Sequence, residues 1–205
     1  MPSDASAVVV NLTAVLGTAA SHLTAWPTGA TMPGTSNVNF DAGTVVPNLA
    51  IVKVGAGGTI QVHNNAGAAH VLVDVYGYYR PGEGLGAMHV AEARILDTRS
   101  GVGGRATPVG AGQTVNLRVR GAGSLPRTGI TAVVLNVTAV NPSATSHVAV
   151  WPHGAAQPAT SNLNLSPGRT VPNLVIVLVG PDGTIDLANN SGDVDLLADV
   201  VGFFA

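Results

Sequence analysis

The chain contains one sequence pattern twice. A shift of 125 positions aligns residues 7–80 with residues 132–205 without a gap, and 38 of these 74 positions are identical. The matching stretches keep their order: VVVNLTAV with VVLNVTAV, SHLTAWPTG with SHVAVWPHG, TSNVNF with TSNLNL, and VPNLAIVKVG with VPNLVIVLVG. Such identity over an ungapped stretch indicates a duplicated structural unit, so the two copies are expected to share one fold.

The repeated pattern is typical of an all-β fold. Valine-rich runs are separated by turn residues, including 26 Gly and 13 Pro, and no segment shows a helical apolar period of 3.6 residues. In the longer copy we expect strands near residues 88–98, 114–120, 132–140, 146–152, 161–166, 173–179, 183–189 and 194–204. Short strands of this number and spacing predict tandem β-sandwich units, jelly-roll-like or Greek-key in topology.

The two copies differ in how they begin. The runs MHVAEARILDTRSG and QTVNLRVRG precede the second copy and have no counterpart before the first. The sequence therefore predicts a shortened first unit at residues 1–83, lacking its opening strands, and a complete second unit at 84–205. A sandwich without two strands leaves backbone edges and apolar faces uncovered. Three covers are conceivable: the segment 84–120, the strands of a homo-oligomer or partner chain, or a remodelled edge.

The composition excludes several classes of protein. Charged residues make up only 10% of the chain and the net charge is −2, which gives no attraction for nucleic acid. No apolar stretch approaches the roughly 18 residues of a membrane helix, so we expect no membrane insertion. The opening Met-Pro-Ser-Asp has no basic and apolar leader, so we expect no signal peptide in this stretch. Cysteine is absent, and no metal or other cofactor is expected.

Two groups of residues are candidates for ligand binding. The motif Trp-Pro-x-Gly occurs in both copies, and an exposed indole on a loop is a stacking surface for a sugar ring. Paired asparagines two positions apart share a strand face and offer neutral hydrogen bonds to sugar hydroxyls. The candidates are Trp26, Trp151, Asn37, Asn39, Asn162 and Asn164. The alternative is that the Trp residues cap the core and the amides join strands.

A third group is charged. Asp74 and Asp199 interrupt apolar final strands, and a carboxylate buried there needs a partner. Arg94, Asp97 and Arg99 in RILDTRSG supply one, so we predict structural ion pairs. A catalytic carboxylate pair is the alternative interpretation. Because no GxSxG, HExxH or Gly-rich phosphate loop is present, we predict no catalytic residue and no enzymatic activity.

The ordered motifs RILDTRSG, QTVNLRV, AVVLNVTAV, VWPHG, TSNLNL, VPNLVIV and ADVVGFF resemble those of an actinobacterial extracellular repeat module. The resemblance covers essentially the whole chain. Modules of this family occur in tandem on secreted and cell-surface proteins, often beside hydrolase or peptidoglycan amidase domains. The resemblance therefore implies an extracellular or cell-surface location and a noncatalytic accessory role, but it brings no ligand-binding residues with it.

These observations lead to two functional hypotheses. The first is a noncatalytic binding or adhesion module that recognises a cell-wall or surface glycan, with the two copies adding avidity. The alternative is a structural or assembly subunit, such as a stalk, a spacer or a strand-complemented oligomer, with no small-molecule ligand.

Overall fold

In the computed structural model the chain is all-β. The structure describes residues 1–82, 84 and 86–205, without the side chain of His89. The chain folds into two compact units, Met1–Gly84 (unit 1) and Leu85–Ala205 (unit 2). The expected boundary at residue 83 lies outside the described residues. Among the described residues no helix is both long and apolar enough to cross a membrane.

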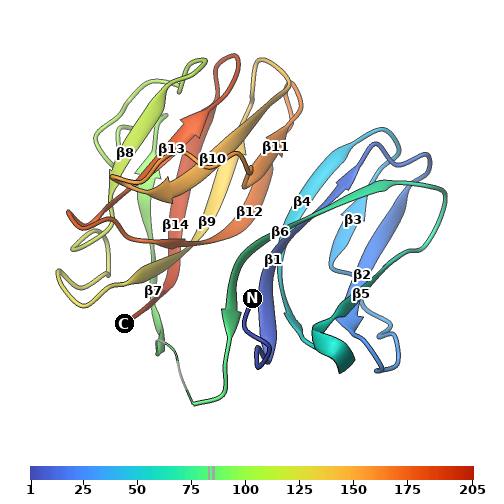
Figure 1. The fold of residues 1–205 in the computed structure, drawn as a ribbon. Helices are drawn as coiled ribbons and strands as arrows, with labels where there is room; N and C mark the ends of the chain where they lie inside the picture. The colour runs from blue at the N-terminus through green and yellow to red at the C-terminus, as the bar shows by residue number, and fades with distance from the viewer. Residues whose placement is uncertain (83, 85) are drawn as a thin grey trace. The chain divides into compact units, whose positions relative to one another are not determined.

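Unit 2 consists of two four-stranded antiparallel sheets (Figure 1). Its strands are β7 (Ala87–Asp97), β8 (Thr114–Arg118), β9 (Ala132–Val140), β10 (Ser146–Pro152), β11 (Leu163–Leu165), β12 (Val171–Leu178), β13 (Thr184–Asn189) and β14 (Asp195–Phe204). The sheet orders are β12-β9-β14-β7 and β11-β10-β13-β8. All eight strands expected from the sequence are present, with ends that differ by a few residues.

The core of unit 2 lies between the inner faces of its sheets. Burial alternates along β9, as expected when one face of a strand points inward. A single cluster of 25 buried apolar residues joins both sheets, and eight of them come from residues 95–130. The segment that precedes the second copy therefore supplies about a third of this core and not only two edge strands.

Unit 1 consists of two three-stranded antiparallel sheets (Figure 1). Its strands are β1 (Ala7–Val15), β2 (Ser21–Pro27), β3 (Val38–Phe40), β4 (Val45–Lys53), β5 (Ile60–Asn64) and β6 (His70–Tyr79), with a short 3-10 turn at Ala56–Gly58. The sheet orders are β4-β1-β6 and β3-β2-β5. They are the orders of unit 2 with the last strand of each sheet removed.

The position of the missing strands follows from these orders. In unit 2, β7 pairs with β14 and β8 pairs with β13. The equivalent strands of unit 1, β6 and β5, are sheet edges. The expected shortening of the first copy thus corresponds to one absent edge strand in each sheet, on the same side of the sandwich.

Candidate functional site

The two tryptophans predicted to bind a ligand each make contacts within their own unit. Trp151 is only 7% exposed and packs with Ala149 and Ala188. Trp26 is half-buried, and its indole N–H donates to the carbonyl of Ala30 at 3.1 Å. An indole buried as deeply as Trp151 has little face left for stacking on a sugar ring. The glycan role of the two tryptophans stays a prediction.

The predicted asparagines make the same contacts in both units. The side-chain oxygens of Asn37 and Asn162 accept backbone N–H groups of the neighbouring strand, each at 2.7 Å. Asn39 and Asn164 accept hydrogen bonds from serines three residues earlier, at 3.0 and 3.1 Å. Asn37 and Asn162 lie just before β3 and β11, so each fixes the entry of a short strand. These bonds fit the alternative in which the amides join strands.

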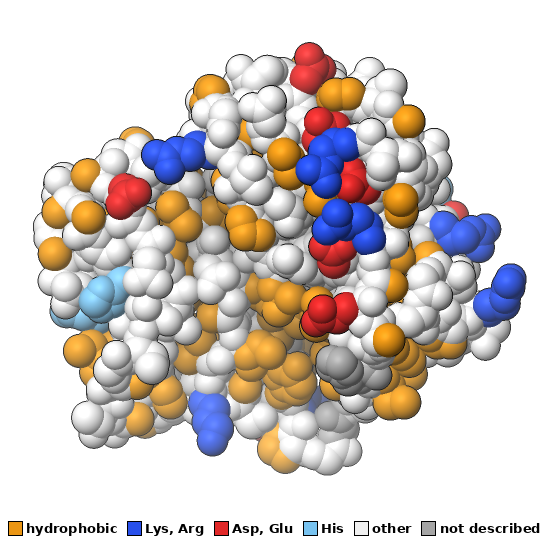
Figure 2. Space-filling view, turned by 180° about the vertical axis from the view of Figure 1, so that it is seen from behind, with side chains coloured by type: hydrophobic (Ala, Val, Ile, Leu, Met, Phe, Trp, Pro, Cys, Tyr) orange, Lys and Arg blue, Asp and Glu red, His pale blue; other side chains and the backbone are white. Residues whose placement is uncertain are grey.

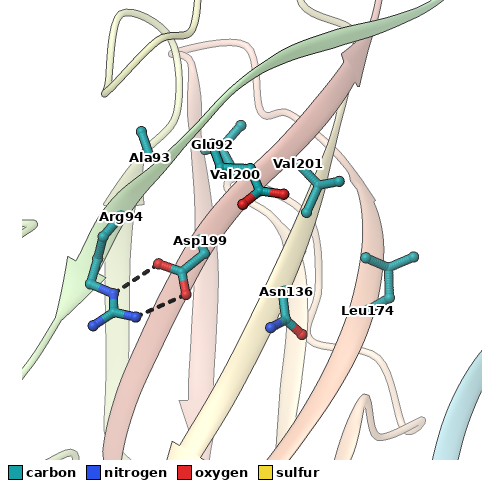
Figure 3. Close-up of a pocket in the computed structure, with 8 residues that line it drawn as sticks. All are labelled: Glu92, Ala93, Arg94, Asn136, Leu174, Asp199, Val200 and Val201. Carbon is teal, nitrogen blue, oxygen red and sulfur yellow. Dashed lines mark hydrogen bonds and ion pairs between the residues drawn. The ribbon is translucent and has the colours of Figure 1, made fainter.

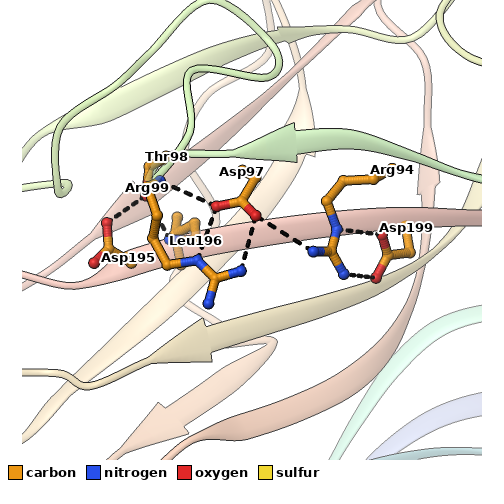
Figure 4. A network of polar contacts seen from close by, with 7 residues as sticks. All are labelled: Arg94, Asp97, Thr98, Arg99, Asp195, Leu196 and Asp199. Carbon is orange, nitrogen blue, oxygen red and sulfur yellow. Dashed lines mark hydrogen bonds and ion pairs between the residues drawn. The ribbon is translucent and has the colours of Figure 1, made fainter.

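The ion pairs predicted for RILDTRSG connect β7 to β14 (Figure 4). Arg94 binds Asp199 through two hydrogen bonds, at 2.8 and 3.0 Å, and reaches Asp97 at 3.3 Å. Arg99 binds the same Asp97 carboxylate at 2.8 and 2.9 Å. The hydrogen bond from Arg99, with the backbone N–H and charge beside it, lowers the pKa of Asp97 to about 2.

Thr98 belongs to this network and was missed in the sequence. Its hydroxyl donates to Asp195 at 2.7 Å and accepts the N–H of Leu196 at 3.0 Å (Figure 4). RILDTR is therefore a strand-joining motif in which four polar side chains hold an edge strand in register. The signal that could have identified Thr98 was its place inside this motif between Asp97 and Arg99.

The same network borders a groove on the face of the sheet opposite the core (Figure 3). Its volume is about 490 Å³, and it is lined by Glu92, Ala93, Arg94, Asn136, Leu174, Asp199, Val200 and Val201. The bidentate pair uses the Nε/Nη2 edge of Arg94 and both carboxylate oxygens of Asp199. Glu92 and Asn136 are the other two polar side chains that line the groove (Figure 3).

A second charged pair lies in the other sheet of unit 2. His153 binds Asp186 at 2.9 Å, and Asn116 of β8 donates to the same carboxylate at 2.9 Å. The hydrogen bond to Asp186 raises the pKa of His153 above its ordinary value. Within the described part of the chain, no group of three or more His, Asp or Glu side chains could hold a metal ion. In Figure 2, red and blue side chains adjoin each other on one part of the visible face.

Asp74, the fifth residue of the predicted ion pairs, has no such partner. It lies half-buried on β6 at the position of Asp199 on β14, opposite Asn11 as Asp199 is opposite Asn136. Across the described residues, no Arg, Lys or His side chain forms an ion pair with Asp74. The strand that carries the arginine in unit 2 is the one that unit 1 lacks.

The edge of unit 1 formed by β5 and β6 exposes side chains that the equivalent strands of unit 2 bury. Of the 25 core residues of unit 2, the 17 outside residues 95–130 have counterparts in unit 1. Ten of these counterparts form the smaller core of unit 1, and two, Ile60 and Ala69, pack against it half-buried. The remaining five are 36–53% exposed: Val62, Val71, Val73, Val75 and Tyr78.

The equivalent positions are buried in unit 2. The counterparts of the five exposed residues are 0–8% exposed: Leu187, Leu196, Ala198, Val200 and Phe203. We refer to β5, β6 and these five exposed side chains as the open edge. It combines inward-facing apolar groups with strand backbones that lack a neighbour on one side, which is the usual surface for strand addition.

No family model matches the chain, and neither a curated protein nor a solved structure is similar enough to it to count as a match.

Proposed function

We propose that this chain is a noncatalytic structural and assembly module of the extracellular or cell-surface type, which joins other polypeptide through the open edge of unit 1. One observation carries the proposal: five apolar side chains that are core residues in unit 2 are exposed in unit 1. Apolar surface of this kind beside two unpaired sheet edges favours association. Unit 2, with both sheets completed, acts as the stable body that carries unit 1.

The charged network of unit 2 supports a structural role. Each carboxylate in it is bound by arginine or by a threonine hydroxyl, and the bonds run from β7 to β14 or stay within β7 and its adjoining turn. A catalytic acid needs a carboxyl group that is free to exchange a proton near neutral pH. The pKa of Asp97, about 2, keeps it ionised instead.

The test is the mass of the full chain in solution as its concentration rises. We expect reversible association from the micromolar range upward. Val75→Lys, in the open edge, should weaken it at least tenfold, because a charge cannot be buried in that interface. Ile51→Lys is the matched control, since Ile51 is 54% exposed against 53% for Val75 and lies on β4 at the other edge of the same sheet. A monomer throughout the range, unaltered by either substitution, contradicts the proposal.

Glycan binding is the second candidate, and the groove of unit 2 favours it. An open groove of about 490 Å³, in which Glu92 and Asn136 lie beside the pair of Arg94 and Asp199, has the size of a small saccharide site. Titration calorimetry with soluble cell-wall polysaccharide tests this. Loss of binding in Asn136→Ala, with binding kept in Trp26→Ala, assigns the groove, and the opposite pattern assigns the Trp loop. No heat of binding in the unmodified chain excludes both sites for that polysaccharide.

A further inference from the structure

We propose that the open edge of unit 1 takes a two-stranded arm of polypeptide from outside residues 1–205, whose first strand pairs with β6 and places an arginine against Asp74 and whose second strand pairs with β5. This inference rests on the proposed function and identifies the partner that it needs. The template for this partner is the segment of unit 2 that has no counterpart in unit 1, residues 86–131. We call this segment the arm of unit 2.

The pairing geometry is available from unit 2. There β7 runs antiparallel to β14 with Ala93 opposite Val200 and Arg94 opposite Asp199. β8 runs antiparallel to β13 with Val115 opposite Leu187. Transferred by the repeat spacing, these registers place the partner's equivalents of Ala93, Arg94 and Val115 opposite Val75, Asp74 and Val62.

Two polar side chains of unit 1 are identical to side chains of unit 2 that bind the arm. Asp74 stands where Asp199 receives two hydrogen bonds from Arg94. Asn64 stands where Asn189 donates to the carbonyl of Val109, in the arm, at 2.9 Å. Without an arm, the amide of Asn64 donates to Ala66 at 3.0 Å instead. In this structure the half-buried Asp74 forms no ion pair with a described Arg, Lys or His side chain, and an arm with an arginine would supply that partner.

The remainder of the asparagine site is the same in both units. Ser21 donates to Asn64 at 2.8 Å as Ser146 donates to Asn189 at 2.7 Å. The amide is therefore fixed at the place where the arm carbonyl is bound in unit 2. The two amides differ in one acceptor: Asn64 donates to Ala66 where Asn189 donates to Val109 of the arm.

Other positions show that the partner is not identical to residues 86–131. His70 replaces Asp195, which accepts the hydroxyl of Thr98 in unit 2. Gln61 replaces Asp186, which accepts the amide of Asn116. A partner fitted to unit 1 should present an acceptor oxygen to His70, and it has no need of an amide donor opposite a carboxylate.

Stoichiometry argues against a second copy as the donor. Residues 1–205 contain two sandwich edges of this kind and one arm, and that arm supplies eight residues to the core of its own unit 2. A copy that donated its arm would open its unit 2 to close a unit 1, with no net gain in buried surface. An unused arm from outside residues 1–205 gains that surface.

The first experiment measures register in the full chain, using residues 86–131 fused to a soluble carrier as the probe. The chain has no cysteine, so Val75→Cys in the chain and Ala93→Cys in the probe form one defined pair. We expect their disulfide to form at least tenfold faster than that of the Ile51→Cys control with the same probe. Addition of the probe without cysteine should convert self-associated chain into a one-to-one complex.

The second experiment tests the arginine. Arg94→Met in the probe and Asp74→Asn in the chain should each weaken binding about three- to tenfold, and the two together should weaken it no more than either alone. A further variant removes the dependence on a soluble probe: residues 86–131 joined directly before Ala7, where Thr131 takes the place of Ser6. Unfolding of unit 1 in this variant, followed by Trp26 fluorescence, should occur at higher denaturant than in the unmodified chain.

Several outcomes overturn the inference. Equal disulfide rates at positions 75 and 51, or no stabilisation of unit 1 by the joined arm, show that the arm does not fit the open edge. If self-association is nevertheless abolished by Val75→Lys, the proposed function stands and only this partner is wrong. If a chain carrying both Val75→Cys and Ala93→Cys closes on itself as fast as the probe reacts, the occupant is the chain's own arm.

Discussion

Units 1 and 2 share about half of their residues over the duplicated stretch, yet one is a closed sandwich and the other is open. Val75 and Val200 are the same residue on equivalent strands, but their exposed fractions are 53% and 0%. The difference lies in the neighbours that residues 86–131 supply to one unit alone. A side chain is a core residue only when a second surface covers it, so identical strands can be core in one unit and interface in the other.

The largest expected effect tests this difference directly. Val200→Ala should destabilise unit 2 by about 2 kcal/mol, because it removes two buried methyl groups and leaves a cavity. Val75→Ala should lower the free energy of unfolding of unit 1 by less than about 1 kcal/mol, because about half of the side chain is already exposed to solvent. Each unit has one tryptophan, so denaturant unfolding can be followed for unit 2 in Trp26→Phe and for unit 1 in Trp151→Phe. Equal costs in both units would falsify the comparison.

The second largest expected effect is a difference in stability between the two units at acidic pH. The pKa of Asp97 is about 2 in the folded state and lies near 4 in an unfolded chain. A lowered pKa contributes stability above pH 4 that is lost as the pH falls toward 2, by at most about 2 kcal/mol. Unit 2 should lose that stability in this window, and Asp97→Asn should flatten the dependence. Urea unfolding followed through Trp151 at pH 7 and pH 2.5 measures it.

The ion pair between Arg94 and Asp199 sharpens the comparison of the two final strands. A double-mutant cycle with Arg94→Met and Asp199→Asn should give a coupling of about 1 kcal/mol, since the geometry is bidentate but the arginine is 42% exposed. In the chain alone, Asp74→Asn should leave the stability of unit 1 unchanged within error. A coupling near zero in unit 2 would show that β7 is held by its apolar side chains alone.

The smallest expected effect concerns His153, which has Thr28 as its counterpart in unit 1. Its pKa is raised by Asp186, so its contribution is fully present below pH 6.5 and is lost as the pH rises through the folded pKa. Unit 2 should become slightly less stable between pH 6 and pH 8, and His153→Gln should abolish that slope. His147→Gln is the control, because His147 forms no ion pair with any carboxylate of the described residues. An unaltered slope in His153→Gln contradicts the assignment.

Strand positions were predictable because alternation and turn residues are local signals. The eight strands of unit 2 and the pairing of Asp199 with Arg94 followed from patterns within short segments or from the need of a carboxylate in an apolar strand for a partner. The part of Thr98 in joining β7 to β14 did not follow, because Asp195 is 97 residues away from it. Nor did the burial of Trp151, since a loop tryptophan has the same local sequence whether it is covered or exposed.

By itself the sequence determined that the chain is all-β, that residues 132–205 repeat the pattern of residues 7–80, and that residues 1–6 hold no counterpart of the two strand-like runs that precede the second copy. These are properties of period, composition and spacing, which need no knowledge of distant contacts. Only the tertiary structure decided that the missing strands belong to two different sheets on one side of the sandwich, and that their absence exposes five core positions. The physical reason is that burial depends on neighbours from distant segments, and no local pattern records whether those neighbours are present.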